Sequence, residues 1–415
     1  MRSSSAKHDP ILSSFLLLMA LLAMSGCLID QIGGAFSKLP EDLERNASKA
    51  TRELIDRAYD GIDPARFVDH HVHMLALGTS VKDAFVNPKM QSGLNLERLK
   101  FWIYVSASGV KNLNNADEEY ASRLVRLTRA SAPRGKFHIL AFDKHYTIDG
   151  SVNSGKTNMY VPNHYVVELA QKYPDVFTPV ISIHPYRADA LQELAKWAKA
   201  GIKYVKWLPN AMGMDPANPA IDPFYRKMKE YNMILLSHAG DEQAVEAKED
   251  QKLGNPLLLR KPLDLGVRVI IAHAASLGEC GDLDSRAPRK ANCFDLFLRM
   301  MDEPKYVGLL FGEISAITQY NRMPNPLATL LSRQDLQSRL VNGSDYPLPA
   351  INALIRTTSL ASEGFITADE RQSLNEIYDY NPLLFDFVLK RTLRHPQTRQ
   401  KLAASIFMAN PGLDK

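Results

Sequence analysis

His71 and His73 stand two residues apart in an apolar segment that begins at Phe67. In a β-strand, side chains at positions i and i+2 point to the same side. The two imidazoles would therefore project together, with Asp69 behind them, and could share one cation. A short pattern of this kind also arises by chance in a histidine-rich strand. It indicates a metal site that more distant residues must complete.

Three further residues of suitable type each follow an apolar segment later in the chain: His238, His273 and Asp345. Four of these residues could bind one ion through three nitrogens and one oxygen, a set that suits zinc and leaves room for water. They are His71, His73, His238 and Asp345. A lone buried histidine usually serves packing, but five such residues after four segments are hard to explain by packing. We therefore expect one divalent metal ion, zinc by its donor set, with His273 beside it.

A cation in this position would lower the pKa of a bound water and generate hydroxide under mild conditions. We expect metal-bound hydroxide to attack the carbonyl carbon of an amide, a lactone or an ester. Asp345 could contact the metal and take the proton as general base. His273 could donate a hydrogen bond to the developing oxyanion or protonate the leaving group. The residues thus predict a metal-dependent hydrolase.

The segments that carry these residues are strand candidates that alternate with amphipathic helices. Eight of them occur, at 67–74, 137–142, 177–183, 204–208, 233–237, 267–272, 307–311 and 339–343. Eight parallel strands close an α/β TIM barrel, which brings their carboxyl ends to one mouth. A doubly wound open sheet is the alternative, but no glycine-rich phosphate loop follows an early strand. Long loops after strands one and six, at 75–136 and 274–306, would lie on the active-site side.

The first 27 residues are typical of a targeting signal. Arg2 and Lys7 give a basic start, an apolar run follows at 11–23, and small residues precede Cys27. The run is short for a membrane span and fits the centre of a secretory signal. Its ending is similar to that of bacterial lipoproteins, whose cysteine is lipidated. We expect an exported, periplasmic lipoprotein anchored through Cys27; a plain signal peptide or a soluble protein with an apolar start is the alternative.

The predicted organisation is a signal peptide in 1–27, a tether and N-terminal helix in 28–60, and the barrel with C-terminal helices in 61–415. The mature length suffices for one large domain or two ordinary ones. Cys280 and Cys293 form an even pair, which an oxidising compartment would allow to join as a disulfide. Two free thiols are the alternative.

Charge and composition bound the partners. Loss of Arg2, Lys7 and Asp9 with the leader changes the formal net charge from +4 to +3. The sequence has no long basic run and no interleaving of aromatic and basic residues, so nucleic acid is not expected. It has no second hydrophobic stretch of spanning length, so membrane attachment would be through the N-terminus. The expected partner is a small-molecule substrate, and a homo-oligomer stays open.

Several residues just beyond strand ends could line a substrate pocket. They are Trp207, His184, Tyr186, Lys144 and Arg322. Arg286, Arg289 and Lys290 lie between the two cysteines and could meet an anionic substrate, although a charge cluster is usually a solvated surface. Three other histidines are interpreted as structural: His70, His138 and His395.

The sequence resembles the amidohydrolase superfamily, in the branch of TIM-barrel metal-dependent hydrolases that includes aminocarboxymuconate-semialdehyde decarboxylase. The resemblance spans residues 65–390 and rests on motifs in a fixed order. These are Val68-Asp69-His70-His71-Val72-His73, Gly201-Ile202-Lys203-Tyr204-Val205-Lys206, Ser237-His238-Ala239-Gly240, the strand before His273, Gly343-Ser344-Asp345-Tyr346-Pro347 and Tyr380-Asn381-Pro382-Leu383-Leu384-Phe385.

The resemblance implies a barrel with four metal ligands, His71, His73, His238 and Asp345. It also implies a catalytic or auxiliary ligand role for His273. In some members a lysine at the end of strand four is carboxylated and bridges two metals; Lys206 is placed similarly, and the alternative is a lysine paired with an acid. Because the branch contains decarboxylases, a metal-dependent lyase is the main alternative activity, and a non-catalytic binding protein is the second. The long loops depart from the family pattern, so the resemblance supports the chemistry more than the substrate.

Overall fold

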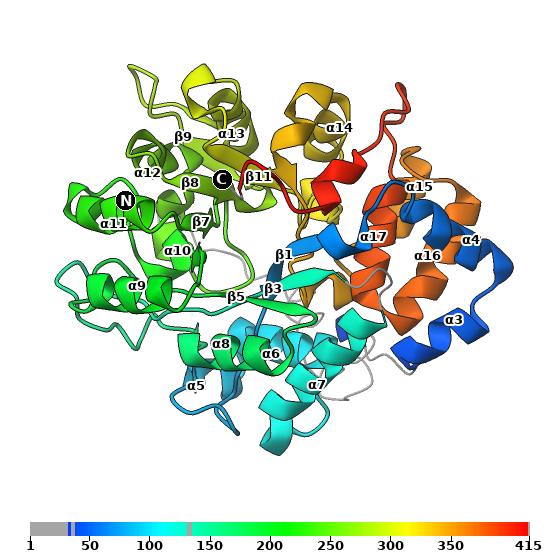
Figure 1. Cartoon of the computed structure of the whole chain (residues 1–415), viewed down its shortest axis with the longest axis horizontal. Helices are drawn as coiled ribbons and strands as arrows, with labels where there is room; N and C mark the ends of the chain where they lie inside the picture. Colours follow the sequence, from blue (N-terminus) through cyan, green and yellow to red (C-terminus); the bar gives the residue numbers. More distant parts are fainter. Residues whose placement is uncertain (1–31, 35–37, 131–134, 414–415) are drawn as a thin grey trace, which may run out of the picture.

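Eight parallel strands form the centre of the structure (Figure 1), a computed structural model that describes residues 32–34, 38–130 and 135–413. In chain order they are β1 (Val68–His73), β3 (Lys136–Leu140), β5 (Phe177–Val180), β6 (Tyr204–Trp207), β7 (Ile234–Ser237), β8 (Arg268–Ile271), β11 (Leu310–Glu313) and β12 (Leu340–Val341). Each predicted strand segment overlaps one of these strands, and only the ends differ. The prediction of an α/β barrel is confirmed.

Hydrogen bonds across two seams join the strands into a ring. One sheet contains β1, β3 and β5, and the other contains β6, β7, β8, β11 and β12. At the first seam, beside β5, the Lys206 amide donates to the Ile181 carbonyl at 2.7 Å. At the second, beyond β12, the His73 amide donates to the Tyr346 carbonyl at 2.9 Å. The carboxyl ends of all eight strands therefore surround one mouth.

The inside of the barrel is filled by apolar side chains of its own strands. All residues of β7 and β8 are buried, because parallel strands of a barrel are covered on both faces. The cluster inside includes Leu140, Val180, Leu236, Ile270, Phe311 and Val341. Leu413, near the end of the chain, joins it, and Arg268 at the start of β8 donates to the Leu413 carbonyl at 2.8 Å. The C-terminal segment thus closes the barrel at the amino ends of the strands.

Helices pack around this ring. They are α8 (Asn163–Lys172), α9 (Ala190–Lys199), α10 (Pro209–Met212), α11 (Asp222–Glu230), α12 (Arg260–Asp264), α13 (Cys293–Met301) and α14 (Asn325–Ser332). Each longer helix buries an apolar stripe, such as Leu194 and Trp197 of α9 or Phe224 and Met228 of α11. This 3.6-residue spacing is the amphipathic pattern that the sequence shows between the strand candidates.

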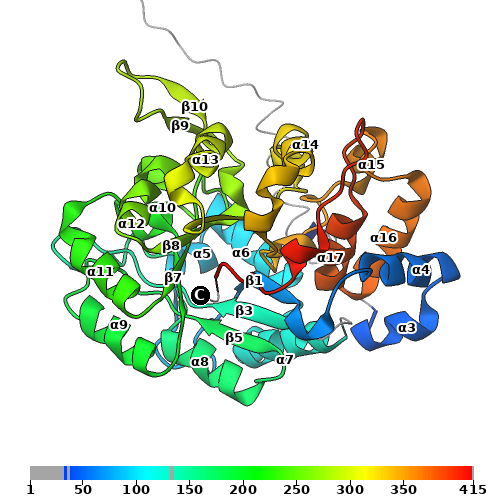
Figure 2. The same ribbon diagram turned by 45° about the horizontal axis from the view of Figure 1, so that its top comes forward.

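N-terminal and C-terminal helices lie side by side outside the barrel. Figures 1 and 2 show α4 (Lys49–Ala58) against α16 (Ala368–Tyr380) and α17 (Pro382–Thr392), with α3 (Leu43–Asn46) and α15 (Thr357–Ser362) nearby. The single N-terminal helix predicted within 28–60 is divided into α3 and α4, because Ser48 interrupts it. Ser48 caps α4 by accepting from the Thr51 amide, and its hydroxyl donates to Glu376 of α16 at 2.8 Å. The break therefore ties α4 to the C-terminal helices.

The two long connections carry secondary structure of their own. The first contains β2 (Phe85–Val86), α5 (Pro88–Gln91), α6 (Leu96–Ala107) and α7 (Ala116–Arg129), and β2 pairs with β4 (Met159–Tyr160). The second contains an antiparallel hairpin, β9 (Glu279–Gly281) and β10 (Lys290–Asn292), which projects from the body (Figure 2). A disulfide between Cys280 and Cys293 joins its two sides.

The predicted signal segment, with Cys27, lies outside the described residues. Among the helices at 32–34, 38–130 and 135–413, none has the length and apolarity to cross a membrane.

Removal of the disulfide should lower the stability of the fold. The two cysteines are 13 residues apart, and a closed loop of this size stabilises by about 3 kcal/mol in the chain-entropy account. We expect the double variant Cys280→Ser, Cys293→Ser to have a free energy of unfolding lower by that amount. Its urea midpoint should fall accordingly. Wild-type protein treated with reductant should show the same shift. An unchanged midpoint in both would contradict this prediction.

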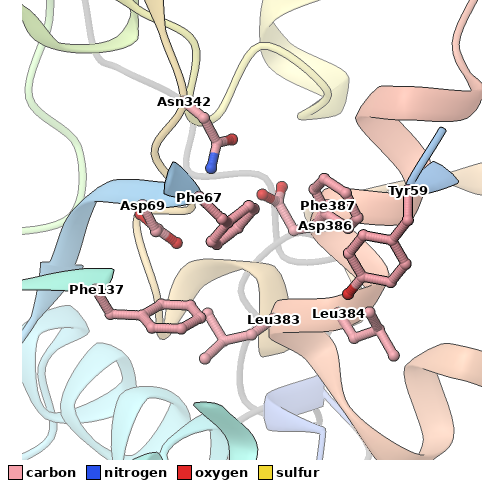
Figure 3. A pocket seen from close by; sticks show the side chains of 9 residues that line it. All are labelled: Tyr59, Phe67, Asp69, Phe137, Asn342, Leu383, Leu384, Asp386 and Phe387. Atoms are coloured by element: carbon pink, nitrogen blue, oxygen red, sulfur yellow. The ribbon is translucent and has the colours of Figure 1, made fainter. Parts of the chain in front are cut away.

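A small cavity separates β1 from α17 and is lined by both apolar and acidic side chains (Figure 3). Its volume, 10 Å³, is about the space that one water molecule needs. Asp69, Asp386 and Asn342 point toward it. Asp386 pairs with the buried Lys390 at 2.6 Å, and Lys390 also donates to the Gly343 carbonyl at 2.6 Å. The ion pair lies within α17, and the hydrogen bond from Lys390 to Gly343 ties this helix to the segment after β12.

The Asp386 carboxyl should make stability depend on pH. Burial raises its pKa to about 7, so between pH 4 and pH 7 the folded chain holds a proton that the unfolded chain releases. The contribution of this carboxyl to the free energy of unfolding is therefore greatest in acid, and it falls as pH rises through that range. We expect Asp386→Asn to flatten this slope in urea unfolding measured from pH 4 to pH 8. Asp56→Asn, on the exposed face of α4, is the matched control and should leave the slope unchanged.

Candidate metal centre

The two histidines of β1 converge although a bulge interrupts the strand. The register against β3 shifts between Asp69 and Val72, which re-aims the side chains between them. His71 Nε2 lies 3.2 Å from His73 Nε2. The His70 ring instead packs on His138, with ring centroids 4.5 Å apart. His71 is fully buried and His73 is partly exposed, so the pair sits at the inner edge of the mouth.

Asp345 completes this group from the other side of the seam. Its Oδ1 lies 3.4 Å from His71 Nε2 and 3.1 Å from His73 Nε2. Its backbone adopts a left-handed φ of 60°, a strained conformation for a residue with a Cβ. The Asp345 amide donates to the His71 carbonyl at 2.7 Å, which holds that conformation. Donor atoms of all three residues lie within 4.8 Å of one another.

Glu313 is a functional residue that the sequence reasoning missed. It ends β11, is fully buried, and its Oε2 accepts from His71 Nδ1 at 2.9 Å and from the Ser315 hydroxyl at 2.7 Å. Ser315 Oγ in turn accepts from His273 Nδ1 at 2.7 Å. One carboxylate thus orients two imidazoles. The predicted strand stopped at Phe311; the rule that found Asp345, a polar residue at a strand's carboxyl end, would have found Glu313 with the correct end.

These hydrogen bonds fix the tautomers. Because Nδ1 of His71 and of His273 each carries the donated proton, the lone pair of each ring lies on Nε2. Glu313 also forms a second cluster of candidate ligands with His71 and His273, but its contacts are on the Nδ1 side. For His71, the Nε2 side is the one toward His73 and Asp345, and it is the side that could bind a common ion.

Gly343 lets the segment after β12 approach the histidine strand. A Cβ at this position would lie 2.4 Å from Glu313 Oε1 and 2.7 Å from His71 Cβ. Only glycine fits there without displacing both residues. The Gly343 carbonyl is also the acceptor for Lys390, so α17 supports the backbone that positions Asp345.

The protonation states suit cation binding. Burial lowers the pKa of His71 and of His273 well below the ordinary value, so both rings are neutral at pH 7. Burial alone would raise the pKa of Asp345, but the nearby His71 and His73 bring it below its ordinary value. Neutral imidazoles and an ionised carboxylate are the forms that bind metal.

Lys206 also reaches this point. Its Nζ lies 3.2 Å from His71 Nε2, and its side chain is buried at the end of β6. Burial lowers its pKa to about 8. The amine donates to the lone pair that a metal would use, so it must withdraw or change its chemistry when a cation binds there. Lys206 therefore lies at the site. The alternative of a lysine paired with an acid is not seen, because no acid among the described residues forms an ion pair with it.

His238 lies beside the group. Its ring centroid is 5.2 Å from that of His273, and its Nδ1 is 3.7 Å from Glu242 Oε2. Its Nε2 is buried and has no hydrogen-bond partner in the described structure. Buried polar atoms are rarely left without a partner, so this nitrogen is free to bind a ligand. The structure brings together the donor atoms of three predicted ligands, His71, His73 and Asp345. His238 lies outside that group and stays a predicted fourth ligand.

Of the predicted substrate residues, the structure brings Arg322 to the mouth. It ends the short helix η9 (Tyr320–Arg322) after β11, is buried, and donates through Nη1 to Ser276 Oγ at 3.0 Å. After burial itself, its charge has the largest effect on the pKa of His273, which it lowers. The geometry agrees with this effect, because the Ser276 amide donates to the His273 carbonyl at 3.0 Å, so the guanidinium lies against the turn that carries His273.

The other predicted substrate residues have different surroundings. Trp207 is fully buried against Phe224 and Tyr225 of α11, so it packs the outside of β6. His184 uses both ring nitrogens, with Met212 O and the Tyr186 amide. The Lys144 ammonium lies over the Tyr160 ring, and the Tyr186 hydroxyl accepts a hydrogen bond from Asn218. The β9–β10 hairpin carries Arg286, Arg289 and Lys290, which are exposed.

A sequence profile described as amidohydrolase matches residues 68–351, more than half of the chain. The matched region contains β1 through β12 and every candidate ligand. The chain therefore belongs to the amidohydrolase family. A comparison with curated proteins found no match.

Solved structures of similar fold share little sequence with this chain. An uncharacterized TIM-barrel protein from Bordetella bronchiseptica is 16% identical, with 75% of this chain and 94% of that one covered and a TM-score of 0.46. A putative 2-pyrone-4,6-dicarboxylic acid hydrolase from Pseudomonas putida is 16% identical, with 68% and 83% covered and a TM-score of 0.38. A manganese-bound 5-carboxyvanillate decarboxylase from Novosphingobium aromaticivorans is 10% identical, with 76% and 94% covered and a TM-score of 0.43.

Proposed function

We propose that this protein is a metal-dependent hydrolase that cleaves an amide, lactone or ester. One observation carries the proposal: the donor atoms of His71, His73 and Asp345 lie within 4.8 Å of one another at the barrel mouth. Zinc is the proposed ion, because a set of imidazoles with one carboxylate suits it. His238 is the proposed fourth ligand. A bound ion would polarise the substrate carbonyl and lower the pKa of a water.

Asp345 is the proposed general base. Its Oδ1 faces His71 and His73, whereas Oδ2 lies 3.9 Å from His273 Nδ1. One oxygen can therefore serve as ligand while the other receives the proton of the attacking water. His273 presents a lone pair on Nε2, so it must accept a proton there before it can give one to the leaving group. Glu313, through Ser315, keeps the ring in that orientation.

Isotope labelling separates hydrolysis from the alternative lyase reaction. Zinc-loaded protein would be screened with lactones, acyl-amino acids and aromatic acids in H₂¹⁸O. Incorporation of ¹⁸O into a carboxylate product supports the hydrolase. Release of carbon dioxide without ¹⁸O incorporation would show that the protein is a decarboxylase instead. Stoichiometric metal with neither product would favour a binding protein.

The number of metals can be counted on the same protein. We propose one ion per chain, with Lys206 as amine. If Lys206 is instead carboxylated and bridges two ions, wild type would hold two and Lys206→Met would hold one.

We also propose that the protein is exported and anchored through a lipid on Cys27. This rests on the leader sequence alone. Wild-type protein should incorporate labelled fatty acid, and a Cys27→Ser variant should not. Absence of label in wild type, or equal label in the variant, would contradict the anchor.

A further inference from the structure

Arg322 is a buried cation without an anionic partner. Its side chain is 8% exposed. In the described part of the chain, no carboxylate lies within ion-pair distance of it, and its Nε has no hydrogen-bond partner. Its Nη1 donates to the Ser276 hydroxyl at 3.0 Å. Another buried arginine, Arg268, has more hydrogen-bond acceptors: it donates to two carbonyls of the C-terminal segment.

This arrangement costs folding free energy. Burial of an unpaired ion is unfavourable by several kcal/mol, because protein surroundings replace its hydration incompletely. A methionine or leucine would fill the same volume without that cost. The acids around the mouth, Asp345 and Glu242, influence Arg322 only through space, and both have other contacts. An arginine left in this state is prepared to pair with a group that arrives from outside the protein.

A second orphan lies on the same loop. Thr318, four residues before Arg322 and also after β11, has a buried hydroxyl for which the described residues supply no hydrogen-bond partner. Because buried hydroxyls usually find one, both residues indicate that the β11 loop faces a polar ligand.

We propose that Arg322, supported by Ser276, binds a carboxylate of the substrate beside the metal centre. The inference rests on the proposed function, because it names the class of substrate for that site: a small molecule with a free carboxylate in addition to the reacting carbonyl. The guanidinium can form two parallel hydrogen bonds to a carboxylate, and water exclusion at the mouth strengthens the pair. Since Arg322 follows β11 and His273 follows β8, the carboxylate would bind on the His273 side of the ion.

Binding of charged and uncharged probes tests this without turnover. The probes are succinate, glutarate and adipate, each compared by calorimetry with its diamide on zinc-loaded protein. We expect at least one diacid to bind more than about 10-fold more tightly than its diamide, in line with a charge-assisted pair worth more than 1.4 kcal/mol. Arg322→Met should abolish this preference with unchanged zinc content, and Arg322→Lys should restore only part of it because lysine lacks the fork.

Zinc itself can attract a carboxylate, so the variants decide the outcome. A diacid preference that survives in Arg322→Met would assign the binding to the metal and overturn the proposal, as would equal binding of diacids and diamides by wild type. Arg356→Met is the matched control: Arg356 stacks on the Tyr320 ring at 4.2 Å at the surface, and its loss should leave the preference intact. If diacids bind through Arg322 but no hydrolysis is found for any carbonyl compound, the proposed function fails while the carboxylate site stands.

Discussion

Asp345→Asn should lower kcat/KM by about 10³-fold, since a positioned general base contributes 10²–10⁴-fold. The amide can still contact a metal and accept a hydrogen bond, but it cannot take the proton of the attacking water. Asparagine also adopts a left-handed φ more readily than most residues, so the fold at this position should persist. Turnover of the best substrate from the labelling screen, with zinc content measured on the same sample, tests the expectation.

Asp60→Asn is the control for this variant, because Asp60 is an exposed carboxylate in the turn after α4, outside the barrel. It should retain full activity. If Asp345→Asn kept wild-type kcat with wild-type zinc, Asp345 would be a ligand or a structural residue and another group would be the base.

His73→Ala should remove the metal. Loss of a residue that only orients a ligand typically costs 10–100-fold in metal affinity, so loss of the ligand itself should cost more than about 100-fold. His73 is suited to this test because its side chain is 26% exposed, so truncation leaves no sealed cavity. Zinc would be titrated against a chelator of known affinity, and thermal unfolding would be followed with and without the ion.

The ion should raise the unfolding temperature of wild type but not of His73→Ala, because a ligand that binds only the folded state stabilises it. His164→Ala, a partly exposed histidine on α8, controls for histidine content. Wild-type zinc affinity in His73→Ala would remove His73 from the site.

Much of the fold could be read from the sequence because its strands are short apolar runs between amphipathic helices. The pattern identified all eight barrel strands, since burial on both faces leaves little room for polar residues. Strand ends were less certain: the segment 307–311 was taken two residues short of Glu313. The break at Ser48 was also missed, because its cause is a hydrogen bond to Glu376, more than 300 residues away.

The candidate site shows the same division. His71, His73 and Asp345 were predicted from their places after strands, and the structure brings their donor atoms together. The hydrogen bonds that orient these residues could not be predicted, because they join distant segments. Glu313 orients two imidazoles, directly and through Ser315, and Lys390 donates to the Gly343 carbonyl. Trp207 illustrates the opposite case, in which a residue at a strand end points into packing.

Leu413 makes completion of the barrel core depend on a segment that is synthesised after all eight strands. The side chain belongs to the cluster inside the ring, and Arg268 donates to the backbone around it. A nascent chain cannot insert this residue until the segment that carries it has left the ribosome, even when every strand has emerged. An affinity tag fused directly after Lys415 would burden the same insertion, and a few residues trimmed from this end would expose the apolar interior to water.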